Sequence, residues 1–270
     1  ARGDAEIRVE VVAAAPAVAG GLVAAAADVL LGAATVVVVA GGGARHDAGA
    51  VLAVAELLGA PVVTSINGTG VVAADHPLGI GSRLGTRAVK DAIEAADAVL
   101  VVGSELAQSD LFLGPVRPRG RVVRIDVDER MRDVNVVSDV MLVGLAEESL
   151  VALRSELLRR GAERPAQTSV WADDLRAAAA AETAASGQRW LPWVAALQSV
   201  LDDDAVIATD NAMCVYYGVI PNLVVRTPSS LHFPTGFGTL GFTVPVAIGA
   251  ALAAPDRQVV GISGDGGLLF

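Results

Sequence analysis

The sequence predicts an α/β protein in which a doubly wound, parallel-sheet central domain precedes the first part of a second α/β domain. Continuous runs of β-branched residues, such as TVVVVA at 35–40, have the composition of strands that are buried on both faces of a parallel sheet. These runs alternate with Ala- and Leu-rich segments of helical length, and that alternation indicates βαβ units. Glycine supplies 29 of the 270 residues, which suits many tight turns between strands and helices.

Residues 1–160 are predicted to form the central, Rossmann-like domain. Strands are expected at 35–40, 61–65, 98–102, 121–127 and 136–143, and a strand-like run, IRVEVV, occupies 7–12. Helices are expected at 17–31, 47–58, 86–96 and 147–160. Asp47 is expected to cap the second of these helices and Gly59 to end it. Residues 66–85 are expected to form a Gly-rich loop.

A linker that contains a helix is predicted at 161–187. Its first part, GAERPAQTSV, has Gly, Pro and polar residues without periodicity, and the Ala-rich stretch at 171–186 is expected to be helical. A second, truncated α/β domain then occupies 188–270. Its helices are expected at 191–201, 213–220 and 243–254, and its strands at 205–209, 223–226 and 259–263. Because the chain lacks an initiator Met and stops where a helix should follow, we expect it to be an internal piece of a longer protein.

The composition narrows the classes of partner. A formal net charge of −10 disfavours sequence-independent binding of nucleic acid, which requires basic surface. No apolar run reaches the ~18 residues of a membrane span, so no membrane partner is expected. The single cysteine, Cys214, allows neither an intrachain disulfide nor a Cys-based metal cluster. That usage fits a reducing compartment, and we expect a cytoplasmic location.

A turn of three glycines, Gly41 to Gly43, follows the first buried strand and could bring backbone N–H groups to a phosphate. The dinucleotide fingerprint, however, needs a glycine where His46 stands and an acidic residue after the second strand, where 65–67 reads SIN. We therefore favour a turn without a ligand, and keep an FAD- or nucleotide-binding site as the alternative.

The three histidines are too far apart in sequence to have metal-ligand spacing. His46 stands beside Arg45 and is expected to be solvated, and His76 is expected to lie in a turn. His232 precedes a Gly-rich segment, so it is the best site candidate of the three.

That Gly-rich segment and the end of the chain carry the chemistry. Three glycines lie close together immediately before the helix at 243–254, namely Gly236, Gly238 and Gly241. Their lack of side chains permits close approach of a flat ligand. Leu240 is the bulky apolar residue among them. The strand at 259–263 then runs into GDGG at 264–267. An aspartate at the carboxyl end of a buried strand, here Asp265, is well placed for a hard cation that bridges to phosphate oxygens.

This combination resembles the thiamine-diphosphate enzymes of the acetolactate synthase, benzoylformate decarboxylase and pyruvate oxidase group. The resemblance covers nearly the whole chain. Segments 37–43 with 60–67, 74–77 and 123–128 look like the group's central domain, and the last 40 residues are the most specific part.

The resemblance implies two cofactors, thiamine diphosphate and Mg²⁺, and a role for each matching position. Asp265 would ligate Mg²⁺, and Gly266 and Gly267 would contact the diphosphate through their backbone. Leu240 would hold the cofactor in its bent shape, and the Gly238 carbonyl would accept a hydrogen bond from the 4′-amino group of the cofactor. The loop with Asn211 and Met213 would lie near the diphosphate.

The implied reaction is decarboxylation or carboligation, or both, of a small-molecule 2-oxo acid. The family's activating glutamate and the asparagine that completes its metal site fall outside this chain, so its catalytic residue is unknown. We expect the chain to be inactive alone, and the family's architecture implies a homodimer or homotetramer.

FAD is not expected. Acetolactate synthases carry an Arg-Phe-Asp-Asp-Arg segment that helps to bind it, whereas 103–110 reads GSELAQSD here, without the arginines. This segment looks more like that of acetolactate-synthase-like 2-oxo acid decarboxylases, including those for a guanidino 2-oxo acid. Two other readings stay open: an FAD- or nucleotide-binding protein, and a non-catalytic interaction protein that keeps the fold.

Overall fold

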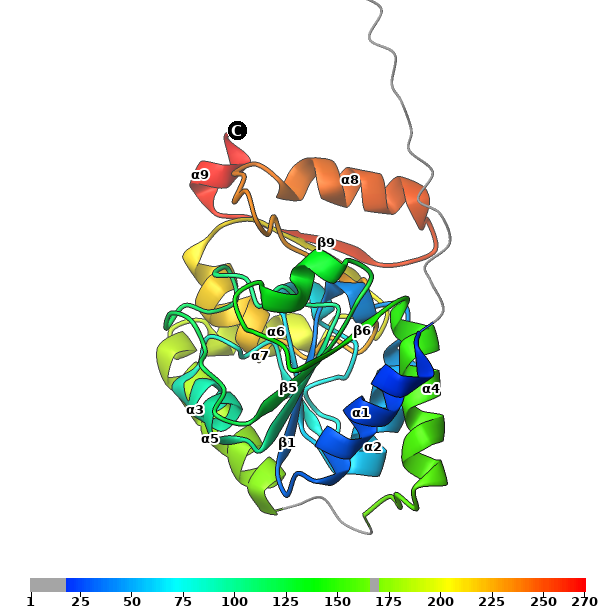
Figure 1. The fold of residues 1–270 in the computed structure, drawn as a ribbon. Helices are drawn as coiled ribbons and strands as arrows, with labels where there is room; N and C mark the ends of the chain where they lie inside the picture. The colour runs from blue at the N-terminus through cyan, green and yellow to red at the C-terminus, as the bar shows by residue number, and fades with distance from the viewer. Residues whose placement is uncertain (1–17, 166–169) are drawn as a thin grey trace, which may run out of the picture.

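The computed structural model describes residues 18–165 and 170–270, and it contains two parallel sheets (Figure 1). The larger sheet has the strand order β3-β2-β1-β4-β5-β6 and the smaller one the order β8-β7-β9. The predicted fold class is therefore confirmed. The strand-like run at 7–12 lies outside the described residues.

The larger sheet is doubly wound about β1. Its strands are β1 (Val36–Ala40), β2 (Val62–Thr64), β3 (Gly79–Gly81), β4 (Ala98–Val102), β5 (Arg121–Asp126) and β6 (Val140–Val143). The chain runs outward from β1 to β3, returns to β4 on the other side of β1, and continues outward to β6. The strand order therefore reverses between β1 and β4, where Val38 pairs with Leu100.

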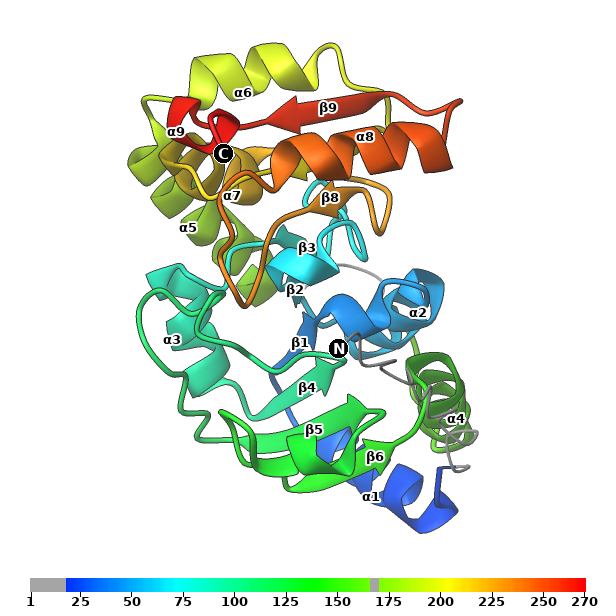
Figure 2. The same cartoon turned by 90° about the horizontal axis from the view of Figure 1, so that it is seen from above.

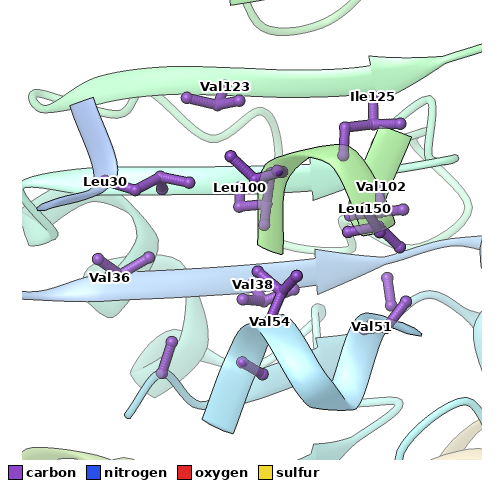
Figure 3. Close-up of a cluster of buried hydrophobic side chains, with 14 of the residues drawn as sticks. Leu30, Val36, Val38, Val51, Val54, Leu100, Val102, Val123, Ile125 and Leu150 are labelled. Carbon is purple, nitrogen blue, oxygen red and sulfur yellow. The ribbon is translucent and has the colours of Figure 1, made fainter. Parts of the chain in front are cut away.

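Helices cover both faces of this sheet (Figure 2). The helices α1 (Gly20–Leu31), α2 (Ala48–Leu58) and α4 (Ala146–Arg159) pack on one face, and α3 (Arg87–Ala95) and α5 (Val170–Gly187) pack on the other. Successive residues of β1 point to opposite faces, because Val38 packs with residues of α1, α2 and α4 and Val39 packs with residues of α3 and α5. Figure 3 shows Val54 of α2 beside Val38. Burial on both faces explains why the strand reads as an unbroken apolar run.

The helix signals were only partly right. Gly59 ends α2 in the left-handed conformation with φ 58°, as expected. Asp47 precedes α2, but its side chain makes no capping hydrogen bond. Its backbone, with ψ 27°, is not in the extended conformation that aims a capping oxygen at the helix amides. At the start of α3, by contrast, Thr86 Oγ1 accepts a hydrogen bond from the Val89 amide.

The smaller sheet is built on β7 (Val206–Thr209), with β8 (Leu231–His232) on one side and β9 (Val259–Ile262) on the other. The helical elements of this part of the chain are α6 (Leu191–Gln198), the π-helix η4 (Val215–Val219), α7 (Ile220–Asn222), α8 (Thr243–Ala253) and α9 (Asp265–Leu268). Its core joins Ile207 of β7 to Val219 and Phe233.

Two strand predictions need correction. The loop expected at 66–85 contains the short strand β3, whose sequence GIG has too little side chain to be recognised as a strand. The strand expected at 223–226 does not form, and β8 lies further along the chain. The Leu223 amide donates to the Val219 carbonyl and the Val224 amide donates to the Gln198 side chain, so these amides serve helices rather than a sheet.

The two α/β units contact each other through the loop that follows β2. Asn67 Nδ2 donates to Thr235 Oγ1 at 2.8 Å, and Arg226 forms an ion pair with Asp75 at 2.7 Å. Ile66 packs into the core of the second unit. The loop at the carboxyl edge of the large sheet is thereby held against the segment that precedes Gly238. The proposed division of the chain at 160 and 188 stays a prediction.

Within the described residues, no helix has the length and apolar character needed to cross a membrane.

Candidate functional site

The carboxyl ends of β7 and β9 are joined by the side chain of Asp210, which is 1% exposed. Asp210 directly follows β7. Its Oδ1 accepts from the Asn211 amide at 2.8 Å, and its Oδ2 accepts from the Gly241 amide at 2.9 Å and from Ser263 Oγ at 3.3 Å. One buried carboxylate therefore connects β7, the Gly-rich loop and the end of β9.

Asp210 is not among the site residues predicted from the sequence, whereas its neighbour Asn211 is. The sequence pattern that identified Asp265, an aspartate at the carboxyl end of a buried strand, also applies to Asp210. Its partners Gly241 and Ser263 are brought to it only by the fold.

At two positions of the site, Gly267 and Gly241, only a glycine fits, because any side chain would collide with a neighbour. A Cβ on Gly267 would lie 2.6 Å from Asp210 Oδ2 and 2.9 Å from Ser263 Oγ. Gly241 has φ 77°, and a Cβ there would lie 2.8 Å from Cβ of Phe270. Side chains at these positions would push the Gly-rich loop away from α9. The structure therefore brings the loop around Gly238 and the turn at Gly267 to one edge of the small sheet.

Asn211 holds the Gly-rich loop from the other side. Its Nδ2 donates to the Thr239 carbonyl at 3.2 Å, and its Oδ1 accepts from the Tyr216 hydroxyl at 2.6 Å. Burial, with the charge of Asp210 as a smaller cause, raises the pKa of Tyr216, so its hydroxyl keeps its proton at neutral pH. In this structure, Asn211 positions the backbone next to Gly238.

Apolar side chains of the same region point away from the core. Leu240 is 44% exposed and Phe237 is 94% exposed. Met213 is 58% exposed. The structure thus brings Asn211 against the loop that carries Gly238 and Leu240, and Met213 follows Asn211 by two residues with an exposed side chain.

Asp265 is the first residue of α9, and its side chain is exposed. Among the described residues, no group of three or more His, Cys, Asp or Glu could hold a metal ion. A lone carboxylate fits Mg²⁺, which commonly takes one or two carboxylates and completes its shell with phosphate oxygens and water. The donor set therefore suits a metal that arrives with a diphosphate, and does not suit a cage made by this chain alone.

The Gly41 to Gly43 turn has a packing explanation. The Gly41 amide donates to the Val102 carbonyl and the Gly43 amide to the Gly103 carbonyl, so neither faces a phosphate. A Cβ on Gly41 would lie 2.1 Å from the Gly103 oxygen. These glycines let the loops after β1 and β4 touch.

The histidines do not converge. His46 is exposed, and His76 Nδ1 accepts from the Leu78 amide at 3.1 Å within a turn. Burial, and then the charge of Arg45, lowers the pKa of His232, so its ring is neutral at pH 7. The His232 carbonyl accepts from Thr209 Oγ1 at the end of β7.

Two adjoining cavities lie between the Gly-rich loop and the large sheet. The smaller, of ≈ 160 Å³, is lined by Asn211 and Gly238 and by the rings of Phe112, Tyr216, Phe233 and Pro234. The larger, of ≈ 340 Å³, is lined mainly by polar and small residues that follow β1, β2 and β4. Ser109, Thr235 and Gly236 line both cavities, so the two meet at these residues.

Two models of known protein families match separate parts of the chain. Residues 23–153 match the thiamine pyrophosphate enzyme central domain, and residues 216–270 match the C-terminal TPP binding domain of the same enzymes. The first match spans the six-stranded sheet, and the second contains the Gly-rich loop and Asp265.

Individual relatives agree with this assignment. A probable 2-ketoarginine decarboxylase of Pseudomonas aeruginosa is 36% identical over 224 residues, covering 82% of this chain and 39% of that protein. A probable acetolactate synthase large subunit of Methanocaldococcus jannaschii is 29% identical, with 82% and 39% covered. The large subunit of acetolactate synthase isozyme 1 of Escherichia coli is 27% identical, with 80% and 39% covered. The chain thus spans about two fifths of the length of these relatives.

Proposed function

Because this chain belongs to the thiamine pyrophosphate enzyme family, we propose that it is part of an enzyme that uses thiamine diphosphate and Mg²⁺ to decarboxylate a 2-oxo acid, to join it to a second carbonyl compound, or both. The proposal rests on the contacts of Asp210 at the carboxyl edge of the small sheet. There one buried carboxylate holds the Gly-rich loop against the turn that presents Asp265.

The proposed division of roles follows from this edge. Asp265 would ligate Mg²⁺, and the backbone of Gly266 and Gly267 would contact the diphosphate. The first amides of a helical turn lack an intrahelical acceptor, so they are free to meet its oxygens. Leu240, already exposed at the end of the loop, would support the ring system, and the Gly238 carbonyl would accept from the 4′-amino group.

When bound, the cofactor supplies an electron sink for the carbanion that decarboxylation leaves behind. The residues of this chain would position it and help to keep water from it. Gly238 and Leu240 can do so only if the loop keeps its shape, and that shape depends on the hydrogen bonds from Asp210 and Asn211. We assign no acid or base in this chain to the reaction.

We further propose that the site is completed by residues outside this chain, in a homodimer or homotetramer located in the cytoplasm. The chain spans about two fifths of its relatives, so we expect no turnover from residues 1–270 alone. FAD is not part of the proposal, because 103–110 lacks the arginines of the FAD-binding segment.

The test is Mg²⁺-dependent binding of thiamine diphosphate by the holoenzyme, measured by calorimetry for wild type, Asp265→Ala and Asp256→Ala. Asp256 is an exposed aspartate of the same unit and serves as the matched control. We expect Asp265→Ala to lose at least tenfold in affinity, and Asp256→Ala to lose nothing. Equal affinity in all three would contradict the role of Asp265. No binding by the wild type would favour a non-catalytic interaction protein.

A further inference from the structure

The larger of the two cavities is lined by a buried carboxylate for which the described residues provide no basic ion-pair partner. Asp110 is 9% exposed and lines this cavity. Its Oδ1 accepts from the Ile66 amide at 2.7 Å. Among the described residues, no hydrogen-bond or ion-pair partner is recorded for its Oδ2. One carboxylate oxygen is therefore held by the backbone, and the other is available to a molecule in the cavity.

Asp110 is mainly ionised at pH 7. Burial raises the pKa of its carboxyl to about 6, and the hydrogen bond from the Ile66 amide opposes the shift. A buried negative charge without a cation is costly, and a bound cation would offset that cost.

The rest of the lining favours a cation over a phosphate. Glu105 is the other charged residue of the cavity wall, which contains no Lys, Arg or His. Its other polar side chains are the hydrogen-bonding groups Ser65, Asn67, Ser104, Ser109 and Thr235. A nucleotide or flavin diphosphate would meet two carboxylates and no basic group here.

The buried Arg124 does not change this charge balance at the wall. Its guanidinium donates to Ser138 Oγ and to the carbonyls of Ser104, Val134 and Val136. The guanidinium of Arg124 therefore donates to these buried oxygens and not to a molecule in the cavity.

The smaller cavity supplies the apolar part of a binding site. It extends from Gly238, the proposed contact of the cofactor, past Phe112, Phe233 and Pro234. Beyond Ser109 and Thr235 it meets the acidic cavity. A path from the cofactor therefore runs first along apolar rings and then to a carboxylate.

We propose that this path binds a 2-oxo acid with a guanidinium group at its far end, with the methylene chain beside Phe112 and Phe233 and the guanidinium donating to Asp110 Oδ2. The planar guanidinium has five N–H donors, which suits a wall of carboxylate, hydroxyl and amide oxygens. The inference rests on the proposed function for the 2-oxo acid part. The relative from Pseudomonas aeruginosa, named for 2-ketoarginine, is consistent with it.

The first test uses a probe that needs no turnover. Binding of n-butylguanidinium is measured by calorimetry at pH 7.5 for the wild-type holoenzyme, for Asp110→Asn and for Glu163→Gln. The asparagine can still accept from the Ile66 amide, and Glu163 is an exposed carboxylate outside both cavities. Thermal unfolding of each variant checks that it is folded.

We expect Asp110→Asn to bind the probe at least tenfold more weakly, because a charge-assisted hydrogen bond is lost, and Glu163→Gln to bind as the wild type does. No binding by the wild type at 10 mM (roughly the weakest affinity expected of a fragment of this size), or equal binding by wild type and Asp110→Asn, would overturn the proposal.

The second test compares two substrates in the holoenzyme, 5-guanidino-2-oxopentanoate and 2-oxohexanoate, whose alkyl tail carries no charge. We expect Asp110→Asn to lower kcat/KM at least tenfold for the first, through KM, and to leave the second within twofold. Equal losses for both substrates would overturn the inference. If neither substrate is turned over but the probe still binds through Asp110, the proposed function fails and the cation site stands.

Discussion

Asp210 and Gly267 are in such close contact that a Cβ on the glycine would lie 2.6 Å from Oδ2 of the aspartate. The same oxygen accepts hydrogen bonds from the Gly241 amide and Ser263 Oγ. Three segments that are far apart in sequence therefore meet on one carboxylate oxygen. The closeness of this contact makes the edge sensitive to one added methyl group.

Gly267→Ala is expected to lower the free energy of unfolding by about 1–3 kcal/mol, because the methyl group overlaps a buried carboxylate. The control is Gly249→Ala, in the middle of α8, where a Cβ would meet nothing within 4 Å. That change should be neutral or stabilise by up to ~1 kcal/mol, since alanine favours a helix. Urea unfolding of both variants measures the difference. A Gly267→Ala protein as stable as the control would show that α9 is not packed against Asp210.

Asp210→Asn is expected to destabilise the Gly-rich loop. An amide keeps one acceptor oxygen, so it can satisfy the Asn211 or the Gly241 amide, but it places an NH₂ group against the other. The unmatched buried donor should cost about 1–3 kcal/mol. Hydrogen exchange of the Gly241 amide should become faster in this variant, and remain unchanged in Asp256→Asn. Unchanged exchange in both would mean that Asp210 does not hold the loop.

The stability of the protein should depend on Asp110 between about pH 4 and pH 6. Its pKa in the folded protein, about 6, is above its ordinary value of 3.8. The folded state therefore binds the proton more tightly, and stability is lost as the pH rises through this window. The loss should amount to about 1–3 kcal/mol. Urea unfolding from pH 4 to 7 should show this slope in the wild type and a smaller slope in Asp110→Asn. The same pH dependence of the free energy of unfolding in both proteins would refute this role of Asp110.

The large sheet could be predicted from the sequence, because each of its central strands is buried on both faces and has to be apolar throughout. Val36–Ala40 and Ala98–Val102 are examples, and both were located to within a residue. The short edge strands were missed because Gly79–Gly81 and Leu231–His232 carry too few side chains to give a pattern. The strand expected at 223–226 failed because its backbone hydrogen bonds go to helices.

The site was predictable only in part, for a related reason. Gly238, Leu240 and Asp265 stand in a recognisable local pattern. The residues that hold them in place, Asp210 above all, act through partners 31 and 53 positions away. The role of Asp110 could likewise not be predicted from the sequence, because its burial and its cavity arise from the packing of the two α/β units.

Binding of thiamine diphosphate and Mg²⁺ at the edge held by Asp210 should slow amide exchange there. It is measured by hydrogen–deuterium exchange of the holoenzyme, with and without thiamine diphosphate and Mg²⁺. We predict that peptides covering 236–241 and 264–270 become protected on binding, while the Gly41 to Gly43 turn is unchanged. Protection of that turn, with none at 236–241 or 264–270, would contradict the account and favour a nucleotide-type site on the large sheet.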